Sequence, residues 1–330
     1  MRSTTALAGQ SSGLERISEL GFGCAAVAGR VSRRDSLAAL AAAHDAGITL
    51  YDTARSYGYG ESESIVGEFL RGRRDSVVLC TKFGILPATQ GGWKQKLKPL
   101  ARGVLRLFPG LRKTVRRQVS DQFVSGQFSV ETLRTSFETS LRELKTDYVD
   151  MLLMHAAPAS VLEQDDLLEA LERLVESGKV RMAGISGELP VIAQYLAGPP
   201  KVLTTAQFAL NLSNIAFAEE TRRHGDLLLV GNHPFGGPAG AAEGKALIAS
   251  LAADPELPQA LRQKLEPKDP QVLPELVLNC VLRGTGVSSV IAAMMQLRHI
   301  ASNVAAVESC RFTLEELEQV RTYRRTTAAV

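Results

Sequence analysis

Eight short runs of aliphatic and β-branched residues recur along the chain, and helical patterns separate most of them. Near-continuous apolar runs of this kind are typical of parallel strands covered on both faces. Eight strands alternating with helices are the number that closes a (β/α)8 TIM barrel, so we expect that fold, with an open doubly wound sheet as the alternative. The runs are Ile17–Gly23, Ile48–Asp52, Val77–Lys82, Tyr148–His155, Val180–Ser186, Val202–Phe208, Leu227–Val230 and Val287–Ala292.

Three segments between these runs have the apolar spacing of amphipathic helices. They are Asp35–Ala46, Glu61–Leu70 and Asp165–Glu176. Gly47 follows the first helix and Gly178 follows the third, and glycine is the residue that most often ends a helix in a left-handed conformation. The predicted helices therefore have defined ends, as a barrel of alternating elements requires.

One feature favours the doubly wound alternative. Gly21, Gly23 and Ala26 form a GxGxxA pattern after the first strand, which is the dinucleotide-binding fingerprint. That fingerprint needs a helix that begins within the motif, so that its N-terminus meets the pyrophosphate. The first convincing helix here begins near Asp35, so we interpret the two glycines as sites of close packing at the mouth of a barrel.

Length and composition fit one large domain. The chain has 330 residues with 45% hydrophobic and 22% charged residues, which is ordinary for a globular protein with a sizeable core. We expect a single barrel domain over residues 1–330. It has no apolar run of about 20 residues and no secretory h-region, so we expect a cytoplasmic protein. The four cysteines lie far apart without a CxxC pair, which indicates buried thiols in a reducing compartment.

A basic segment interrupts the pattern after the third strand, at about residues 86–128. From Lys94 to Asp121 there are nine Lys or Arg residues and one acid, a local charge of +8, and the net charge of +3 leaves 3 − 8 = −5 for the rest. Apolar residues recur at helical spacing between the charges, although Pro99 and Pro109 would interrupt a helix. We favour a surface subdomain, and keep as alternatives a lid carrying Trp93, membrane-surface contact and nucleic-acid binding.

Four chemically complementary residues fall at or near the carboxyl ends of predicted strands. Asp52 follows the second strand and Tyr57 lies five residues later, in a glycine-rich loop. Lys82 ends the third strand and His155 ends the fourth. Because the catalytic groups of TIM barrels gather at this end of the strands, we expect these four side chains to converge.

Together the four residues suit the reduction of a carbonyl group. The developing alkoxide needs a proton source, and a tyrosine becomes a better acid-base group when a lysine ammonium stabilises its phenolate. A carboxylate can hold that lysine in place, and a histidine can polarise or orient the carbonyl. No side chain supplies a hydride, so a nicotinamide cofactor is implied.

Several motifs in order along the chain resemble the aldo-keto reductase family. The resemblance runs from about Leu20 to Val307, apart from the basic segment. It is carried by Tyr51-Asp52-Thr53-Ala54, Tyr57-Gly58, Gly60-Glu61-Ser62-Glu63, Thr81-Lys82, Thr146-Asp147-Tyr148-Val149-Asp150, Leu152-Leu153-Met154-His155, Gly178-Lys179-Val180-Arg181 and Gly184-Ile185-Ser186.

The resemblance implies a (β/α)8 oxidoreductase in which Asp52, Tyr57, Lys82 and His155 are the catalytic tetrad. Tyr57 would be the acid in reduction and the base in oxidation. Ser186 and Gln207 match positions that hold the nicotinamide carboxamide. Gly187 stands where the family usually has Asn, which removes one side-chain contact to that amide.

The resemblance also implies cofactor contacts after the seventh strand. The segment there departs from the family's aromatic-Ser-Pro-Leu pattern, and Asn232 takes the place of a ring that stacks on nicotinamide. Glycines in this segment let the backbone approach a pyrophosphate. The residues expected to contact the cofactor are Asn232, Pro234, Phe235, Gly236 and Gly237.

Near the C-terminus, Ser302 and Asn303 resemble the pair that contacts adenine. Residues that commonly surround the cofactor 2′-phosphate are replaced here by Ala293, Met294 and His299. Arg298 lies one position away and can compensate. The cofactor is therefore NADPH or NADH, with NADPH favoured by the resemblance.

We therefore predict an NAD(P)H-dependent enzyme that reversibly reduces an aldehyde or ketone, such as a sugar or a biosynthetic carbonyl, to an alcohol. Two alternatives stay open: a lyase that uses Lys82 as a Schiff-base nucleophile, and a cofactor-binding regulatory barrel without turnover. No HxH or HExxH spacing indicates a metal site. The expected partner is a small-molecule carbonyl or alcohol substrate, and we expect neither nucleic-acid binding nor membrane contact. The sequence predicts neither substrate identity nor oligomeric state.

Overall fold

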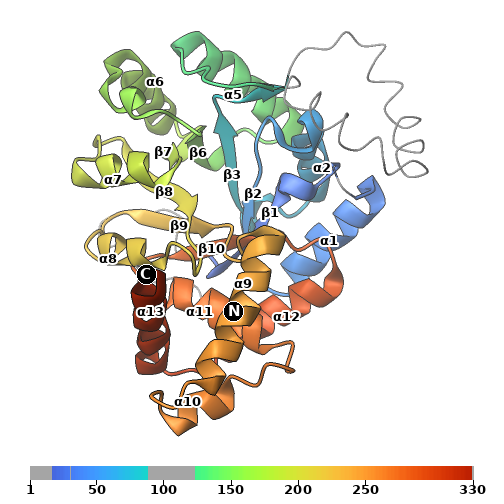
Figure 1. Cartoon of the computed structure of the whole chain (residues 1–330). Helices are drawn as coiled ribbons and strands as arrows, with labels where there is room; N and C mark the ends of the chain where they lie inside the picture. The colour runs from blue at the N-terminus through green and yellow to red at the C-terminus, as the bar shows by residue number, and fades with distance from the viewer. Residues whose placement is uncertain (1–16, 30, 88–122, 329–330) are drawn as a thin grey trace, which may run out of the picture.

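A closed barrel of eight parallel strands forms the centre of the molecule (Figure 1). The computed structural model describes residues 17–29, 31–87 and 123–328 of the chain. The strands follow one another around the barrel in the order β1-β10-β9-β8-β7-β6-β3-β2. Their bounds are β1 Leu20–Gly23, β2 Leu50–Asp52, β3 Val78–Phe83, β6 Val149–His155, β7 Val180–Ser186, β8 Leu203–Ala209, β9 Leu228–Asn232 and β10 Ser289–Ala292. The predicted barrel is confirmed, each of the eight apolar runs supplies one strand, and the doubly wound alternative is wrong.

Helices surround the barrel, and their ends follow the local sequence. The three predicted helices are confirmed as α1 Arg33–Asp45, α2 Ser62–Phe69 and α6 Asp165–Glu176. The Ser32 side chain accepts a hydrogen bond from the backbone N–H of Asp35 at the start of α1. Gly47 and Gly178 both have positive φ angles, 84° and 73°, as expected of glycines that follow a helix. The other helices are α5 Val130–Leu144, α7 Leu189–Ala197, α8 Ala218–Thr221, α9 Gly237–Ala253, α10 Gln259–Lys264, α11 Val272–Leu282, α12 Leu297–Glu308 and α13 Leu314–Ala328.

The glycines after β1 serve packing and do not open a dinucleotide-binding helix. A short 3-10 turn, Cys24–Ala26, follows the strand, and α1 begins only at Arg33. A Cβ added to Gly21 would lie 3.0 Å from the side chains of Ile291 and Leu50 on the two neighbouring strands. The interpretation of these glycines as close-packing positions therefore holds.

Apolar side chains fill three regions. Strand residues such as Leu50, Met151 and Val230 pack inside the barrel, and a larger core lies between the strands and the surrounding helices. A third core lies among the C-terminal helices and includes Leu251 and Leu276. Figure 1 shows these helices, α9 to α13 in orange to red, gathered on one side of the barrel. No helix in the described ranges is both long and apolar enough to cross a membrane.

The ends of the basic segment pair with each other. Strand β4 (Leu86–Pro87) and strand β5 (Phe123–Val124) form a two-stranded antiparallel sheet beside the barrel. Residues 88–122, which include Trp93 and most of the basic segment, lie outside the described residues. The interpretation of this segment as a surface subdomain therefore stays a prediction. Three of the cysteines are buried, Cys310 is half-buried, and all four are free thiols.

Asp150 joins three strands near the end of the barrel opposite the tetrad. Its carboxylate is buried and accepts hydrogen bonds from Arg74 at 2.8 Å, from Arg181 at 2.7 Å and from the backbone N–H of Leu79 at 2.8 Å. Both guanidinium groups lie over the Tyr148 ring, at 3.8 and 4.6 Å from its centroid. The carboxylate thus compensates the positive charge of two arginines, and its hydrogen bonds link β3, β6 and β7.

We predict that Asp150→Ala lowers the free energy of unfolding by about 3–5 kcal/mol, because it leaves two partly buried arginines without their anion. Urea unfolding followed by circular dichroism measures the change. Asp147 is exposed on the same segment, and Asp147→Ala should change stability by less than about 0.5 kcal/mol. Equal effects of the two substitutions would contradict the role given to Asp150.

Candidate active site

Polar side chains from six strands meet at the carboxyl ends of the barrel strands. Parallel pairing in the barrel aligns these ends, for example Asp52 with Cys80, and Ser186 with both His155 and Gln207. The carboxyl end of a TIM barrel is where catalytic groups gather. The six residues are Asp52 of β2, Lys82 of β3, His155 of β6, Ser186 of β7, Gln207 of β8 and Asn232 of β9.

Lys82 is the centre of this cluster. Its side chain is fully buried, and its ammonium donates to Asp52 Oδ1 at 2.5 Å, to the Thr53 carbonyl at 3.0 Å and to the Tyr57 hydroxyl at 3.5 Å. Burial alone would lower the pKa of Lys82, but the Asp52 carboxylate offsets this, and the pKa lies above its ordinary value. Lys82 is therefore a permanent cation with all three N–H groups directed at oxygen atoms.

A strained turn places Tyr57 beside Lys82. The 3-10 segment Tyr57–Gly60 contains two consecutive left-handed residues, Gly58 with φ 60° and Tyr59 with φ 59°. A Cβ at residue 58 would come within 2.4 Å of the Val27 carbonyl oxygen, so only glycine fits there. The turn is fixed by this close approach, and it directs the Tyr57 hydroxyl back towards β3.

The environment keeps Tyr57 protonated. Burial raises the pKa of Tyr57, and the Lys82 ammonium offsets only part of that rise. The phenol is therefore a proton donor at neutral pH, and any phenolate formed from it would face the ammonium.

His155 is held as a neutral imidazole next to Tyr57. Burial and, to a smaller extent, repulsion from Lys82 lower its pKa to about 3. Its ring meets the Tyr57 ring edge-on, with centroids 5.7 Å apart. The Nδ1 atom is buried without a hydrogen-bond partner among the described residues, so the described part of the chain leaves this polar atom unsatisfied. The structure thus brings together all four residues predicted to converge.

A hydrogen bond across the barrel extends the cluster, and sequence reasoning did not foresee it. Gln207 Nε2 donates to Asp52 Oδ1 at 2.9 Å, and Ser186 Oγ donates to Gln207 Oε1 at 2.9 Å. Strands β8 and β2 lie on opposite sides of the barrel. The two residues expected to hold a carboxamide therefore bond to each other, and Gln207 also bonds to the carboxylate that holds Lys82.

Glu63 is a second residue whose role sequence reasoning missed, although it lies in a quoted motif. Its buried carboxylate accepts from Thr81 Oγ1 at 2.7 Å and from Arg55 at 2.8 Å. Thr81 precedes Lys82, and Arg55 belongs to the loop that carries Tyr57. From α2, Glu63 thus links strand β3 to the loop that carries Tyr57. Its place in the motif Gly60-Glu61-Ser62-Glu63 is the sequence signal that could have revealed it.

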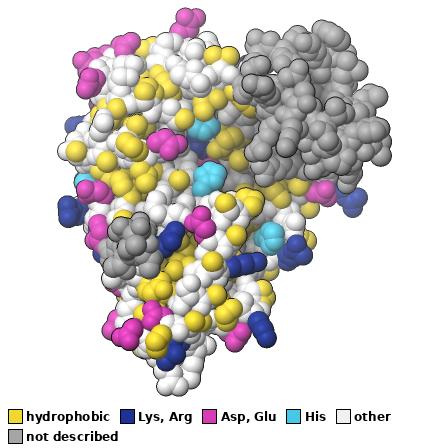
Figure 2. Space-filling view, viewed as in Figure 1, with side chains coloured by type: hydrophobic (Ala, Val, Ile, Leu, Met, Phe, Trp, Pro, Cys, Tyr) yellow, Lys and Arg dark blue, Asp and Glu magenta, His cyan; other side chains and the backbone are white. Residues whose placement is uncertain are grey.

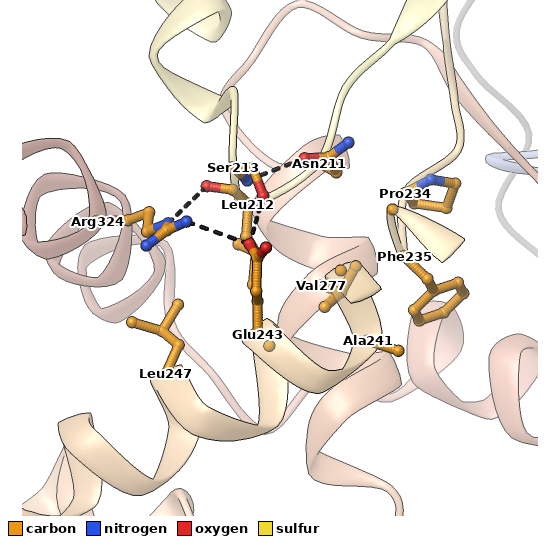
Figure 3. Close-up of a pocket in the computed structure, with 13 residues that line it drawn as sticks. Asn211, Leu212, Ser213, Pro234, Phe235, Ala241, Glu243, Leu247, Val277 and Arg324 are labelled. Atoms are coloured by element: carbon orange, nitrogen blue, oxygen red, sulfur yellow. Dashed lines mark hydrogen bonds and ion pairs between the residues drawn. The ribbon is translucent and has the colours of Figure 1, made fainter. Parts of the chain in front are cut away.

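The end of β9 and the segment after it place the predicted cofactor contacts in different surroundings. Pro234, Phe235 and Gly236 line a small cavity of about 10 Å³, room for one water at most, which Figure 3 shows beside the contact between Glu243 and Arg324. Gly236 and Gly237 have φ angles of 59° and 69° and lead into α9. Asn232 Oδ1 is buried without a hydrogen-bond partner in the described part of the chain.

A larger cavity of about 820 Å³ lies between α9, the connection from α10 to α11, and α12. Phe235, Arg298, Ser302 and Asn303 line it, so the structure brings these four predicted contacts together. Ser302 and Gln271 bond reciprocally: Ser302 Oγ donates to the Gln271 side chain at 2.8 Å, and Gln271 Nε2 donates to the Ser302 carbonyl at 2.7 Å.

These features fit a nicotinamide dinucleotide. The cavity has the size of a cofactor site. Gly236 follows Phe235, which lines the cavity, and has a left-handed φ of 59°. The buried polar atoms His155 Nδ1 and Asn232 Oδ1 have no hydrogen-bond partner among the described residues, although neither residue lines this cavity. Among the described residues, no group of three His, Cys, Asp or Glu side chains could hold a metal ion.

Comparison with known proteins places the chain among the aldo/keto reductases. The model of the aldo/keto reductase family matches residues 19–325. Aldo-keto reductase YhdN of Bacillus subtilis is 31% identical over 175 residues, covering 51% of this chain and 43% of the relative. Methylglyoxal reductase YeaE of Escherichia coli is 30% identical over 154 residues, covering 47% of this chain and 39% of the relative. These matches span less than half of either relative.

Among solved structures, an aldo/keto reductase from Klebsiella pneumoniae in complex with NADP and acetate has a TM-score of 0.67 at 23% identity. The match covers 98% of this chain and 96% of that one. At this level of identity the likeness shows the fold, which extends over nearly the whole chain.

We predict that His155 does not titrate between pH 5 and 8. With its pKa lowered to about 3, the protonated form should be about 1% of the total at pH 5, whereas an ordinary histidine is largely protonated there. Proton–carbon correlation spectra over this range test the prediction, with the His155 signal assigned by its loss in His155→Gln. A His155 signal that shifts with a midpoint near pH 6.5 would contradict it.

Proposed function

The chain belongs to the aldo/keto reductase family, and we propose that it reduces the carbonyl group of a small aldehyde or ketone with a nicotinamide cofactor. The observation that carries the proposal is the Lys82 ammonium, which contacts the Asp52 carboxylate at 2.5 Å and the Tyr57 hydroxyl at 3.5 Å. This arrangement provides a protonated phenol at the barrel mouth and a cation that stabilises the phenolate left after proton transfer.

Tyr57 is the proton donor in this proposal. Its raised pKa keeps the phenol protonated at neutral pH, and its hydroxyl lies at the open end of the barrel. In reduction the carbonyl oxygen becomes an alkoxide and takes the Tyr57 proton, so the product is an alcohol. In the reverse direction the phenolate takes the proton back from the alcohol.

Asp52 and Lys82 support this transfer without reacting themselves. The carboxylate fixes Lys82 as an ammonium, and Gln207 and Lys82 together hold the carboxylate. An ammonium has no lone pair, so Lys82 is not a nucleophile in this state. This argues against the Schiff-base lyase.

His155 orients the substrate. A neutral imidazole has one N–H to donate, and His155 is neutral above a pKa of about 3. Donation to the carbonyl oxygen would place that oxygen beside the Tyr57 hydroxyl, since the two rings are 5.7 Å apart. A neutral donor also adds no further charge to those of Lys82 and Asp52, which already act on the phenol.

A reduced nicotinamide, when bound, supplies the hydride that the carbonyl carbon accepts. The residues proposed to hold its carboxamide are Ser186, Gln207 and Asn232, whose Oδ1 lacks a partner among the described residues. Backbone at Gly236 and Gly237 would face the pyrophosphate. Ser302, Asn303 and Arg298 line the cavity proposed for the adenosine half.

We propose short aldehydes as the first substrates to test, because one partial relative carries the name methylglyoxal reductase. Another partial relative is called 6-dehydroglucose reductase, which makes oxidised sugars the second class. We treat residues 1–330 as a single domain in which the segment at about 86–128 is an insertion.

We predict that Tyr57→Phe lowers kcat for aldehyde reduction by about 10²–10⁴-fold, because the ring stays and only the transferable proton is lost. The loss of reduced-nicotinamide absorbance measures the rate. The dissociation constant of the cofactor, measured by fluorescence, should change less than about twofold, as for a neutral substitution. Tyr148→Phe is the matched control, because Tyr148 stacks on Arg74 and Arg181 at the other end of the barrel.

Three outcomes would overturn the proposal. Full activity in Tyr57→Phe would remove the proposed acid. Binding of cofactor by the wild-type chain without turnover of any aldehyde, ketone or alcohol in the panel would favour the regulatory barrel. Borohydride trapping of an adduct on Lys82 would favour the lyase instead.

A further inference from the structure

The hydrogen bond to Lys82 does not by itself fix the position of the Tyr57 hydroxyl. The two atoms lie 3.5 Å apart, whereas a well-formed bond from nitrogen to oxygen spans about 2.7–3.2 Å. The Tyr57 ring meets the His155 ring only edge-on, with centroids 5.7 Å apart. The position of the hydroxyl therefore depends on the backbone of the turn Tyr57–Gly60 that carries it.

This turn packs against two other segments of the chain. One contact is with Val27, whose carbonyl oxygen would lie 2.4 Å from a Cβ at residue 58. The second is with the β4–β5 sheet, formed by Leu86–Pro87 and Phe123–Val124. A Cβ at residue 60 would lie 3.4 Å from Pro87 Cγ, so the sheet touches the turn directly.

An aromatic contact strengthens the link between the turn and the β4–β5 sheet. The rings of Tyr59 and Phe123 are nearly parallel, at 17°, and their centroids are 6.2 Å apart, within the range in which aromatic pairs attract each other. Tyr59 has φ 59° and ψ 35°. A residue with a side chain keeps this left-handed conformation only where its surroundings hold it there. The contact with Phe123 is one such restraint.

Phe123 and its neighbour Val124 differ in their surroundings. Phe123 pairs with Pro87 and is half-buried, whereas Val124 is 46% exposed. Successive side chains of a strand point to opposite faces, so Phe123 faces the turn and Val124 faces away from it. Figure 2 shows further hydrophobic side chains, next to histidines, over the region where Figure 1 places the barrel strands.

We propose that Phe123 is a positioning residue for the reduction, which holds Tyr59 and, through the turn, the Tyr57 hydroxyl. The inference rests on the proposed function, because the group that it positions is the proposed proton donor. It makes the β4–β5 sheet, at the two ends of the basic segment, part of the support of the active site.

Phe123→Ala tests the proposal, because it removes the ring and keeps the strand. We expect kcat for aldehyde reduction to fall by about 10- to 100-fold, since a displacement of about 1 Å of a reacting group can cost this much. The dissociation constant of the reduced cofactor should change less than about twofold. Phe123→Tyr keeps the ring and should restore kcat to within about twofold of the wild-type value.

Val124→Ala is the matched control on the same strand. It also truncates an apolar side chain, but one that faces away from the turn, so it should leave kcat unchanged. Tyr59→Gly removes the other ring of the pair. If Phe123 acts through Tyr59, adding Phe123→Ala to Tyr59→Gly should lower kcat less than about twofold further. Thermal unfolding checks that each variant is folded.

The His155 signal tests the position of Tyr57 without turnover. Because the two rings are in edge-on contact, the ring current of Tyr57 contributes to the chemical shifts of the His155 ring protons. In proton–carbon correlation spectra we expect Phe123→Ala to shift the His155 signal. Phe123→Tyr and Val124→Ala should leave that signal in place.

Wild-type kcat in Phe123→Ala would overturn the proposal, as would equal effects of Phe123→Ala and Val124→Ala. A loss of kcat that Phe123→Tyr shares would also overturn it, because the ring would then not be the cause. Failure here is distinct from failure of the proposed function. Aldehyde reduction at the wild-type rate by Phe123→Ala would refute only the role of Phe123. A wild-type chain that reduces no carbonyl compound, with a His155 signal that only Phe123→Ala shifts, would refute only the reductase.

Discussion

The buried contact between the Lys82 ammonium and the Asp52 carboxylate is the interaction on which the site depends. An unpaired ammonium at this depth would lose its proton or destabilise the fold. Here the carboxylate at 2.5 Å and the Thr53 carbonyl at 3.0 Å accept two of its N–H groups, and the third is directed at the Tyr57 hydroxyl. The register of β2 on β3 produces this contact, because it pairs Asp52 with Cys80, two residues before Lys82 on the same strand.

Burial beside this ion pair sets the protonation states of its two neighbours. Tyr57 and His155 are both buried, and burial favours the neutral form of each. The phenol consequently keeps its proton, whereas the imidazole carries no charge down to a pH of about 3. Burial thus leaves a proton donor and a neutral hydrogen-bonding group side by side next to a fixed cation. Closure of the barrel strengthens the arrangement, because Gln207 reaches Asp52 from the opposite strand.

The sequence predicted the parts of this structure that depend on local pattern. Apolar runs located all eight strands, and glycines after helices located Gly47 and Gly178 at the ends of α1 and α6. Strand ends then located Asp52, Lys82 and His155, since parallel strands align their carboxyl ends. Contacts between distant residues were not predictable in this way. Gln207 meets Asp52 across 155 positions, and its partner depends on the closure of the barrel.

The C-terminal helices show the same limit. Their amphipathic faces meet in a core of their own, around Leu251 and Leu276, and this packing creates the cavity that Lys245 and Lys268 line. Both lysines are ordinary surface residues in the sequence, with no motif around them. Only the approach of α9 to the connection after α10 brings them to the same cavity.

Mass spectrometry of the product tests the central claim most directly. The alcohol is formed in ordinary water from a short aldehyde and a reduced cofactor that carries deuterium at both positions of the reactive carbon of the nicotinamide. The account predicts one deuterium on the former carbonyl carbon and a hydroxyl hydrogen that comes from the protein and water, and it predicts little product with Lys82→Met. A folded wild-type chain that forms no alcohol, or an alcohol without deuterium on that carbon, would contradict it.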